Sequence, residues 1–174
     1  MIITTETYWS FHPLSRDFDK KDFTCGESSL DDYLQTKAGQ HQKRNIAKAT
    51  VAVDPQRPKK VAGYYTLNTS IIDYNEFPAS HQKKLPYGLD IPSAKIGRLA
   101  VDLRYQGQGL GEELLIDAFY KIHRMSSEIG IHSIIVDSLT EKAKSFWLKH
   151  DFIPFENQPS SLFLPISTIE GLFS

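Results

Sequence analysis

Residues 96–118, reading IGRLAVDLRYQGQGLGEELLIDA, have the types and spacing of a phosphate-binding site. An apolar run ends at Val101, and three alternating glycines follow at Gly107, Gly109 and Gly111. Because glycine has no side chain, backbone N–H groups can approach phosphate oxygens closely there. The residues after Gly111 have the apolar periodicity of a helix, whose first turn adds N–H donors and the positive end of its dipole. The stretch therefore predicts a strand, a glycine turn and a helix that hold a phosphorylated ligand.

The turn matches neither of two common nucleotide motifs. A P-loop has lysine and then serine or threonine after its last glycine, whereas Gly111 is followed by Glu112 and Glu113. With two carboxylates in place of the lysine, no positive charge is available for a terminal phosphate. This argues against a nucleoside triphosphate as the ligand. The dinucleotide fingerprint is G-x-G-x-x-G after a first strand, but this chain has G-x-G-x-G past its midpoint.

The rest of the chain predicts alternating strands and helices that position this turn. Ser28 with Asp31, and Ser138 with Glu141, have the spacing of helix-capping residues. Antiparallel strands early and a strand–helix–strand crossover later predict an α/β (α+β) fold with a mixed central sheet. The predicted strands are residues 49–53, 61–67, 95–101, 131–136, 152–155 and 161–164; the predicted helices are residues 30–38, 111–125 and 141–149, with a short one around 80–85 in an irregular stretch, 75–92.

Length and composition predict a single domain over residues 1–174, with 40% hydrophobic and 24% charged residues. No apolar run approaches the roughly 18 residues of a membrane span. The N-terminal sequence MIITTETYWSFHPLS lacks the basic and apolar regions of a secretory signal. Cys25 is the only cysteine and cannot form an internal disulfide, which agrees with a reducing compartment, so we expect a cytoplasmic protein. The histidines have no metal-ligand spacing, so no metal is predicted.

Three features together resemble the GNAT N-acetyltransferase superfamily. Gln106, Gly109 and Gly111 fill its acetyl-CoA signature, Q/R-x-x-G-x-G/A, and residues 99–102 supply the LAVD that precedes it. Residues 143–152 are similar to the family's A-x-x-F-Y…G-F element. The resemblance implies a GNAT fold and acetyl-CoA as the co-substrate of an acyltransferase.

The resemblance also implies which residues contact acetyl-CoA. The strand of Leu99, Ala100 and Val101 would pair its backbone with pantetheine, and one of its amides would polarise the thioester carbonyl. Thr140 stands where many members have an asparagine that touches pantetheine, and Phe146 is either a coenzyme contact or a core residue. The diphosphate would lie against Gln106, Gly107, Gln108, Gly109, Leu110 and Gly111.

Trp147 departs from the family pattern, which usually has tyrosine there to protonate the leaving thiolate. An indole N–H can donate a hydrogen bond but is too weak an acid to release its proton usefully. Three interpretations stay open. The thiolate leaves into a polarised site or through water; Tyr65, Tyr105 or Ser138 donates instead; or the enzyme is weakened.

The N-terminal half resembles the toxin-type GNAT proteins. Residues 23–26, 30–34, 61–67 and 96–102 are similar to their pattern F-x-C-G, L-D-x-L, V-x-G-Y-Y-x-L and L-G-R-L-A-V-D. This resemblance implies acetylation of the α-amino group of aminoacyl-tRNA, which stops translation, and a ribbon-helix-helix antitoxin as partner. The alternatives are a GNAT enzyme for a small amine or a protein N-terminus, and a catalytically weakened CoA-binding protein.

Several charged and apolar residues have two interpretations each. Arg98, in a predicted central strand, forms a structural ion pair or contacts substrate. Residues 33–53 contain basic side chains and no acidic one, which suits either a solvated helix face or an RNA backbone contact. The net charge of −1 gives no global attraction for nucleic acid, so such a contact would be local. Apolar residues at 162–164 and 172–173 indicate a covered surface, in a homodimer or against an antitoxin.

Overall fold

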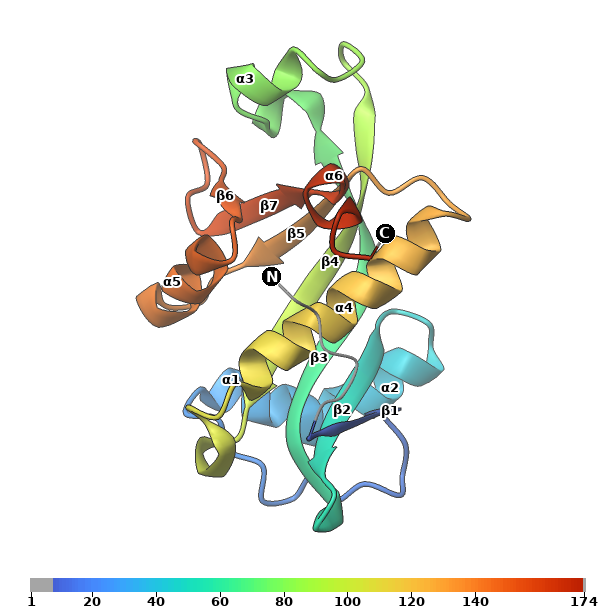
Figure 1. The fold of residues 1–174 in the computed structure, drawn as a ribbon, viewed down its shortest axis with the longest axis vertical. Coiled ribbons are helices and arrows are strands. Elements are labelled where there is room, and N and C mark those ends of the chain that lie inside the picture. The colour runs from blue at the N-terminus through green and yellow to red at the C-terminus, as the bar shows by residue number, and fades with distance from the viewer. Residues whose placement is uncertain (1–7, 174) are drawn as a thin grey trace. The chain divides into compact units, whose positions relative to one another are not determined.

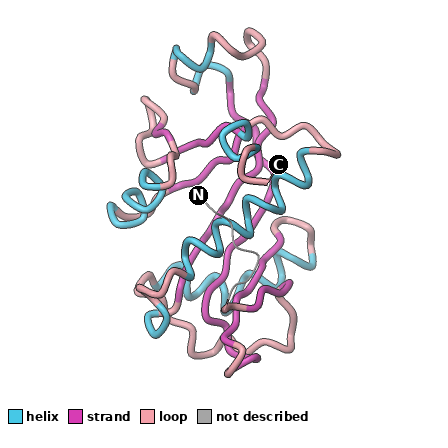
Figure 2. The backbone as a smooth tube through the Cα atoms, in the orientation of Figure 1, coloured by secondary structure: helices cyan, strands magenta, loops and turns pink. Residues whose placement is uncertain are grey.

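A computed structural model describes residues 8–173 of the chain. The first seven residues, part of the stretch expected not to form a secretory signal, lie outside the described range. Helices, strands and loops alternate along the described chain (Figure 2). The strands are β1 (Ser10–Pro13), β2 (Lys48–Asp54), β3 (Arg57–Asp73), β4 (Asp90–Val101), β5 (Ser133–Asp137), β6 (Ile153–Pro154) and β7 (Ser161–Pro165) (Figure 1). The helices are α1 (Ser28–Asp32), α2 (Ala38–Lys43), α3 (Ala79–Gln82), α4 (Leu110–Ser126), α5 (Glu141–Lys149) and α6 (Ile166–Glu170), with a π-helical turn at Tyr33–Lys37 and 3₁₀ turns at Tyr74–Glu76 and Leu103–Tyr105.

The described strands form one sheet in the order β1-β2-β3-β4-β5-β7-β6. The pairs β1–β2, β2–β3, β5–β7 and β6–β7 are antiparallel. In contrast, β4 and β5 are neighbours joined through helix α4, which is the kind of connection that parallel strands need. The mixed sheet confirms the predicted α/β class.

The predicted elements are present, but several differ in extent. Strands β3 and β4 are longer than the predicted 61–67 and 95–101, because pairing continues into polar residues that carry no apolar alternation. Strand β1 and helix α6 were not predicted. Ser28 is not the cap of the first helix, since Glu27 occupies that position without a side-chain cap bond. Asp31 instead accepts a hydrogen bond from the amide of Cys25 at 2.8 Å.

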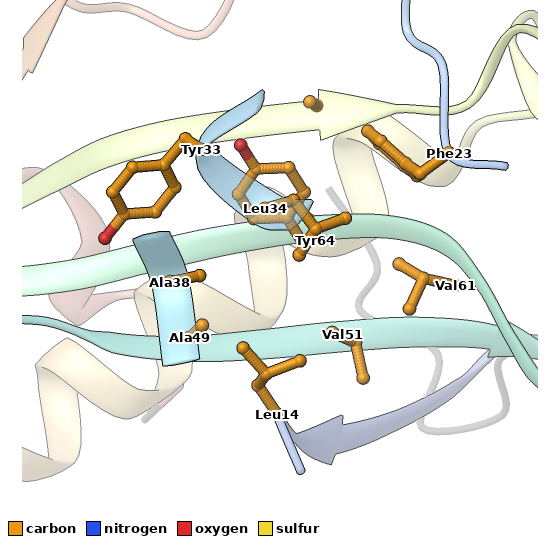
Figure 3. Packing of buried hydrophobic residues seen from close by; sticks show 10 residues of the cluster. Leu14, Phe23, Tyr33, Leu34, Ala38, Ala49, Val51, Val61 and Tyr64 are labelled. Carbon is orange, nitrogen blue, oxygen red and sulfur yellow. The ribbon is translucent and has the colours of Figure 1, made fainter. Parts of the chain in front are cut away.

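The chain divides into two compact units, residues 1–68 with 96–120 and residues 69–95 with 121–174. In the first unit, Leu34 and Ala38 pack against Val51 and Tyr64 of strands β2 and β3 (Figure 3). The hydroxyl of Tyr64 donates to the carbonyl of Leu30 at 2.7 Å, so this buried ring is satisfied at the helix. The α1–α2 segment therefore covers one face of these strands.

Helix α4 packs on the opposite face of β3 from the α1–α2 segment. Neighbouring residues of a strand point to opposite faces, so Tyr64 faces one of these elements and Tyr65 the other. Tyr65, next to Tyr64, donates its hydroxyl proton to Asp117 of α4 at 2.6 Å. Gly63 lets this helix approach closely: a Cβ there would lie 3.0 Å from Leu114 Cδ1 and 3.1 Å from the carbonyl oxygen of Ala100.

This close approach predicts a stability cost for any side chain at Gly63. Gly63→Ala should lower the free energy of unfolding by about 1–3 kcal/mol, the usual range for overpacking, because the Ala100 carbonyl belongs to a strand and cannot move aside. Denaturant unfolding measures the effect. Gly130→Ala is the matched control, since its Cβ would meet nothing within 4 Å. An equal loss in both variants would contradict the packing argument.

The second unit has its own aromatic core. The ring of Phe77 lies edge-on to Phe155 at 5.9 Å and to Phe163 at 5.1 Å. Ile72 and Ile91 complete this buried cluster. Strand β7 pairs with both β5 and β6, so Phe163 is held from both sides of its strand.

Candidate functional site

The glycine turn (residues 106–111) leads from a short 3₁₀ turn into helix α4, as the sequence predicts. Gly107 and Gly109 have φ values of 78° and 83°, in the left-handed region that favours glycine. A Cβ on either glycine would meet nothing within 4 Å, so open space lies beside the backbone. The amide of Glu113 donates to the carbonyl of Gly109 at 3.2 Å, which starts the helix at the end of the turn.

The turn would bind an anion through backbone amides rather than through cationic side chains. Leu110, the first residue of α4, is buried and anchors the helix start. Glu112 and Glu113 occupy its first turn, where a helix dipole favours negative charge. The basic side chain just before the turn, Arg104, is bound by the carboxylate of Asp102 at 2.9 Å.

The structure gives the side chain of Gln106 a role that the sequence did not indicate. Its amide nitrogen donates to the carbonyl oxygens of Val101 and Cys25, each at 2.9 Å. The side chain thus holds the start of the turn, and its main chain leads into the glycines. Gln106 is thus both the first residue of the acetyl-CoA signature and the residue that fixes the start of the turn.

The end of strand β4 keeps the alternation that a coenzyme-pairing strand would need. Ala100 is buried in the core cluster of the first unit, whereas Leu99 and Val101 are half-buried. Leu99, Ala100 and Val101 run directly into the glycine turn, so strand, turn and helix are one continuous segment of the first unit. The role of these residues in coenzyme binding stays a prediction.

Of the three candidate hydroxyl acids, Tyr105 donates its proton to the carboxylate of Asp54. The other two, Tyr65 and Ser138, also have their protons engaged. Tyr65 is 0% exposed, and its proton bonds Asp117. Burial raises the pKa of Tyr65 far above its ordinary value, and the Asp117 carboxylate raises it further. The hydroxyl of Ser138 donates to the carbonyl of Ser160 at 2.9 Å. Neither geometry favours proton donation to a thiolate. Tyr64 and Tyr65 point to opposite faces of the sheet, and both are buried.

The remaining predicted residues lie on or next to helix α5 in the second unit. Thr140, not Ser138, is the N-cap of this helix, because its hydroxyl accepts from the amide of Ala143 at 3.1 Å. That hydroxyl still has its own proton to donate. Trp147 is 5% exposed, and its ring lies 5.1 Å from those of Phe146 and Phe152. Phe146 therefore packs in an aromatic cluster, and its role as a coenzyme contact stays a prediction.

Arg98 makes no ion pair with another side chain of residues 8–173. Its guanidinium carbon lies 3.4 Å from the centre of the Tyr33 ring, a cation–π contact. The hydroxyl of Tyr33 is in turn 3.0 Å from Nδ1 of His41. The predicted structural ion pair is therefore wrong; the alternative of a substrate contact stays open.

Two further features of residues 8–173 bear on the kind of site. They contain no group of three or more His, Cys, Asp or Glu side chains arranged to hold a metal ion. No helix among them combines the length and apolar character that crossing a bilayer requires.

Comparison with known proteins identifies the family. No family model matches the chain. A protein of Mycobacterium tuberculosis (strain ATCC 25618 / H37Rv), named tRNA-acetylating toxin, is 32% identical over 154 residues, covering 88% of this chain and 90% of that protein. The chain belongs to the GNAT family of tRNA-acetylating toxins. The resemblance inferred from the motifs is thereby confirmed.

Solved structures of related toxins agree with this family in fold. AtaT complexed with acetyl-methionyl-tRNAfMet is 35% identical and matches with a TM-score of 0.87, covering 95% of this chain and 99% of that one. A mutant of AtaT bound to the C-terminus of the antitoxin AtaR and acetyl-CoA is 32% identical with a TM-score of 0.82, covering 97% of this chain and 99% of that one. These matches confirm the predicted GNAT fold.

Proposed function

We propose that this chain is a cytoplasmic toxin that transfers the acetyl group of acetyl-CoA to the α-amino group of aminoacyl-tRNA and so blocks translation. The observation that carries the proposal is the glycine turn before α4, in which two left-handed glycines leave open backbone beside a helix start. Such a turn suits the diphosphate of acetyl-CoA. The related toxin AtaT, bound to acetyl-methionyl-tRNAfMet, supports the acceptor. We further propose that residues 1–174 act as one acetyltransferase domain, because β3, β4 and α4 each contribute to both compact units.

The proposed acceptor explains why the chain needs little base catalysis. An α-amino group titrates near pH 8, whereas a lysine side chain titrates near 10.4, so much more of the α-amine is neutral at physiological pH. The enzyme then acts mainly by holding amine and thioester together and excluding water. An amide of the strand at Leu99, Ala100 and Val101 would stabilise the developing oxyanion.

The leaving thiolate is the harder step for this chain. The family resemblance assigns the position of the usual acid to Trp147. The hydroxyl protons of Tyr65, Tyr105 and Ser138 are already engaged. We therefore propose that the thiolate leaves without an acidic side chain and takes its proton from water. Turnover should be slower than in a relative that has tyrosine there.

Mass spectrometry of the reaction products tests the proposed function. The protein is incubated with isotope-labelled acetyl-CoA and a mixture of aminoacyl-tRNAs, with uncharged tRNA, small amines and peptides as parallel acceptors. We expect label on the α-amino group of one or more aminoacyl-tRNAs and none on uncharged tRNA. Label on small amines or peptide N-termini alone would favour the non-toxic alternative. Acetyl-CoA binding by calorimetry without any release of free thiol would favour the weakened binding protein.

A local basic surface supports tRNA as the partner despite the net charge of −1. Lys43 and Arg44, at the end of helix α2, are exposed, and neither has an ion pair within residues 8–173. Lys48 donates to Asn45 at 2.7 Å and is therefore held close to that helix end. Cations exposed without carboxylate partners remain available to phosphates.

Removing these two charges should weaken tRNA binding in a salt-dependent way. The double variant Lys43→Ala/Arg44→Ala is expected to reduce the slope of log affinity against log salt by about 1–2, one unit for each phosphate that the protein no longer neutralises. Filter binding over a range of salt concentrations measures it. Lys83→Ala/Lys84→Ala removes the same charge from two other exposed residues and should leave the slope near wild type. An equal reduction in both variants would contradict a local tRNA-binding surface.

An antitoxin is the second proposed partner. The AtaT mutant bound to the C-terminus of AtaR supports it, and the toxin-type motifs imply a ribbon-helix-helix protein. A homodimer is the alternative partner. The predicted covered surface does not include residues 162–164, which are buried in the core of this chain; residues 172–173 are half-buried. An adjacent gene for a small ribbon-helix-helix protein, and a stable complex on co-expression, would support the antitoxin.

A further inference from the structure

Asp102, directly after strand β4, is a fully buried carboxylate with four hydrogen bonds. It is 0% exposed, yet lies beside an exposed turn. Arg104 donates to it three times, from its main-chain amide and Nε at 2.9 Å each and from Nη2 at 3.0 Å. The amide of Thr24 donates at 3.1 Å. Because a buried carboxylate is costly unless its oxygens are satisfied, this arrangement fixes the conformation of residues 102–104.

Residues that follow Asp102 are also bound to residues 22–26. The amide of Leu103 donates to the carbonyl of Thr24 at 2.8 Å. Gln106 reaches the carbonyl of Cys25 at 2.9 Å. Asp31 of α1 accepts from the amide of Cys25 at 2.8 Å, so helix α1 anchors the segment in turn. These bonds join motifs that are far apart in the sequence, F-x-C-G, L-D and L-A-V-D, into one network.

The glycine turn itself has little to hold its shape. Gly107 and Gly109 are exposed, and the space where their side chains would be is empty. The conformation of such a turn is set by the residues at its two ends. These are the buried Leu110 at the C-terminal end and the hydrogen-bond network of Asp102 and Gln106 at the N-terminal end.

We propose that Asp102 is a positioning residue for the diphosphate of the coenzyme: with Gln106 and the main chain of residues 22–26, it holds the N-terminal end of the glycine turn so that the turn's amides converge on phosphate oxygens. The inference rests on the proposed function, since it takes acetyl-CoA as the ligand. It also assigns a role to the N-terminal F-x-C-G segment, whose backbone rather than its side chains acts on the turn.

The charge state of Asp102 fits this role. Burial alone would raise its pKa, but the hydrogen bonds from Arg104 and Thr24 outweigh burial and hold the pKa below its ordinary value. The carboxylate is therefore ionised at neutral pH and neutralises Arg104. An asparagine at 102 would turn an N–H donor toward a donor of Arg104, which removes the paired hydrogen bonds at almost unchanged volume.

The test compares two acetyl donors that differ in the diphosphate. S-acetylpantetheine has the thioester and pantetheine of acetyl-CoA but lacks the diphosphate and the adenosine 3′-phosphate that the diphosphate carries. For Asp102→Asn we expect kcat/KM for acetyl-CoA to fall about 10- to 100-fold, mainly through KM, with kcat/KM for S-acetylpantetheine within about twofold of wild type. Asp17→Asn removes an exposed carboxylate of the same unit and should change neither value.

Each outcome decides between distinct roles for Asp102. Equal losses with both donors would mean that Asp102 only stabilises the fold, and no loss with either would overturn the inference directly. If Asp102→Asn does not fold, Gln106→Ala at the half-buried end of the network takes its place with the same expectation. A wild-type protein that uses both donors equally, or neither, would contradict the proposed coenzyme site itself.

Discussion

Gly109→Val is expected to lower kcat/KM for acetyl-CoA by about 10- to 100-fold while the protein stays folded. A β-branched residue at a φ of 83° is strained by about 1–3 kcal/mol, which the turn relieves by rotating the adjacent peptide. That rotation turns an amide away from the diphosphate, and the valine side chain fills the space that the coenzyme needs. Steady-state kinetics with varied acetyl-CoA and calorimetric binding measure both effects.

Gly88→Val is the matched control for backbone strain. Gly88 also has a positive φ, 69°, and its Cβ would also meet nothing within 4 Å. The two variants should lose similar stability, but only the Gly109 variant should lose coenzyme affinity. If the Gly88 variant loses as much kcat/KM, the effect is general strain and the diphosphate assignment to the turn is contradicted.

The strand, turn and helix around residues 96–118 could be predicted from sequence because each part is specified locally. Apolar alternation, glycines at special φ values and a helical periodicity all act over a few residues. The end of strand β4 and the start of helix α4 at Leu110 accordingly lie within a residue of their predicted positions. Helix caps were less predictable: Ser138 has the right spacing, yet Thr140 makes the cap, since both residue types suit an N-cap and only the chain geometry selects one.

The interactions that hold the candidate site could not be predicted, because they join residues distant in the sequence. Thr24 and Asp102 are 78 positions apart, and their bond goes to a main-chain amide that any residue other than proline could supply. Nothing in the residue types at 22–26 indicates this pairing. The side-chain acids were misjudged for a related reason: whether a hydroxyl such as that of Tyr65 is free depends on a partner, Asp117, on another element.

The toxin-type motifs predicted more of this protein than the apolar and glycine patterns did, because their residues have structural roles in the first unit. The toxin-type positions Phe23, Asp31, Gly63 and Asp102 are each explained by a packing or hydrogen-bond role in the first unit. These positions therefore hold together the strands, the helices and the glycine turn of the first unit. These structural roles do not indicate the acceptor of the acetyl group. The prediction of aminoacyl-tRNA came from the family resemblance alone.

Trp147→Tyr is expected to raise turnover about tenfold over wild type while acetyl-CoA binding is kept. A phenol at this position can give the leaving thiolate a proton that the indole cannot, and general acids typically contribute about 10²–10⁴-fold, part of which is lost to imperfect placement. Trp147→Phe is the matched control, because it loses the same packing against Phe146 and Phe152 without gaining a hydroxyl. Both variants should lose about 1–3 kcal/mol of stability from the smaller ring. Single-turnover acetyl transfer, followed beside calorimetric binding, separates chemistry from affinity. A tyrosine variant that binds well but reacts no faster than the phenylalanine variant would show that proton donation at this position does not limit the reaction.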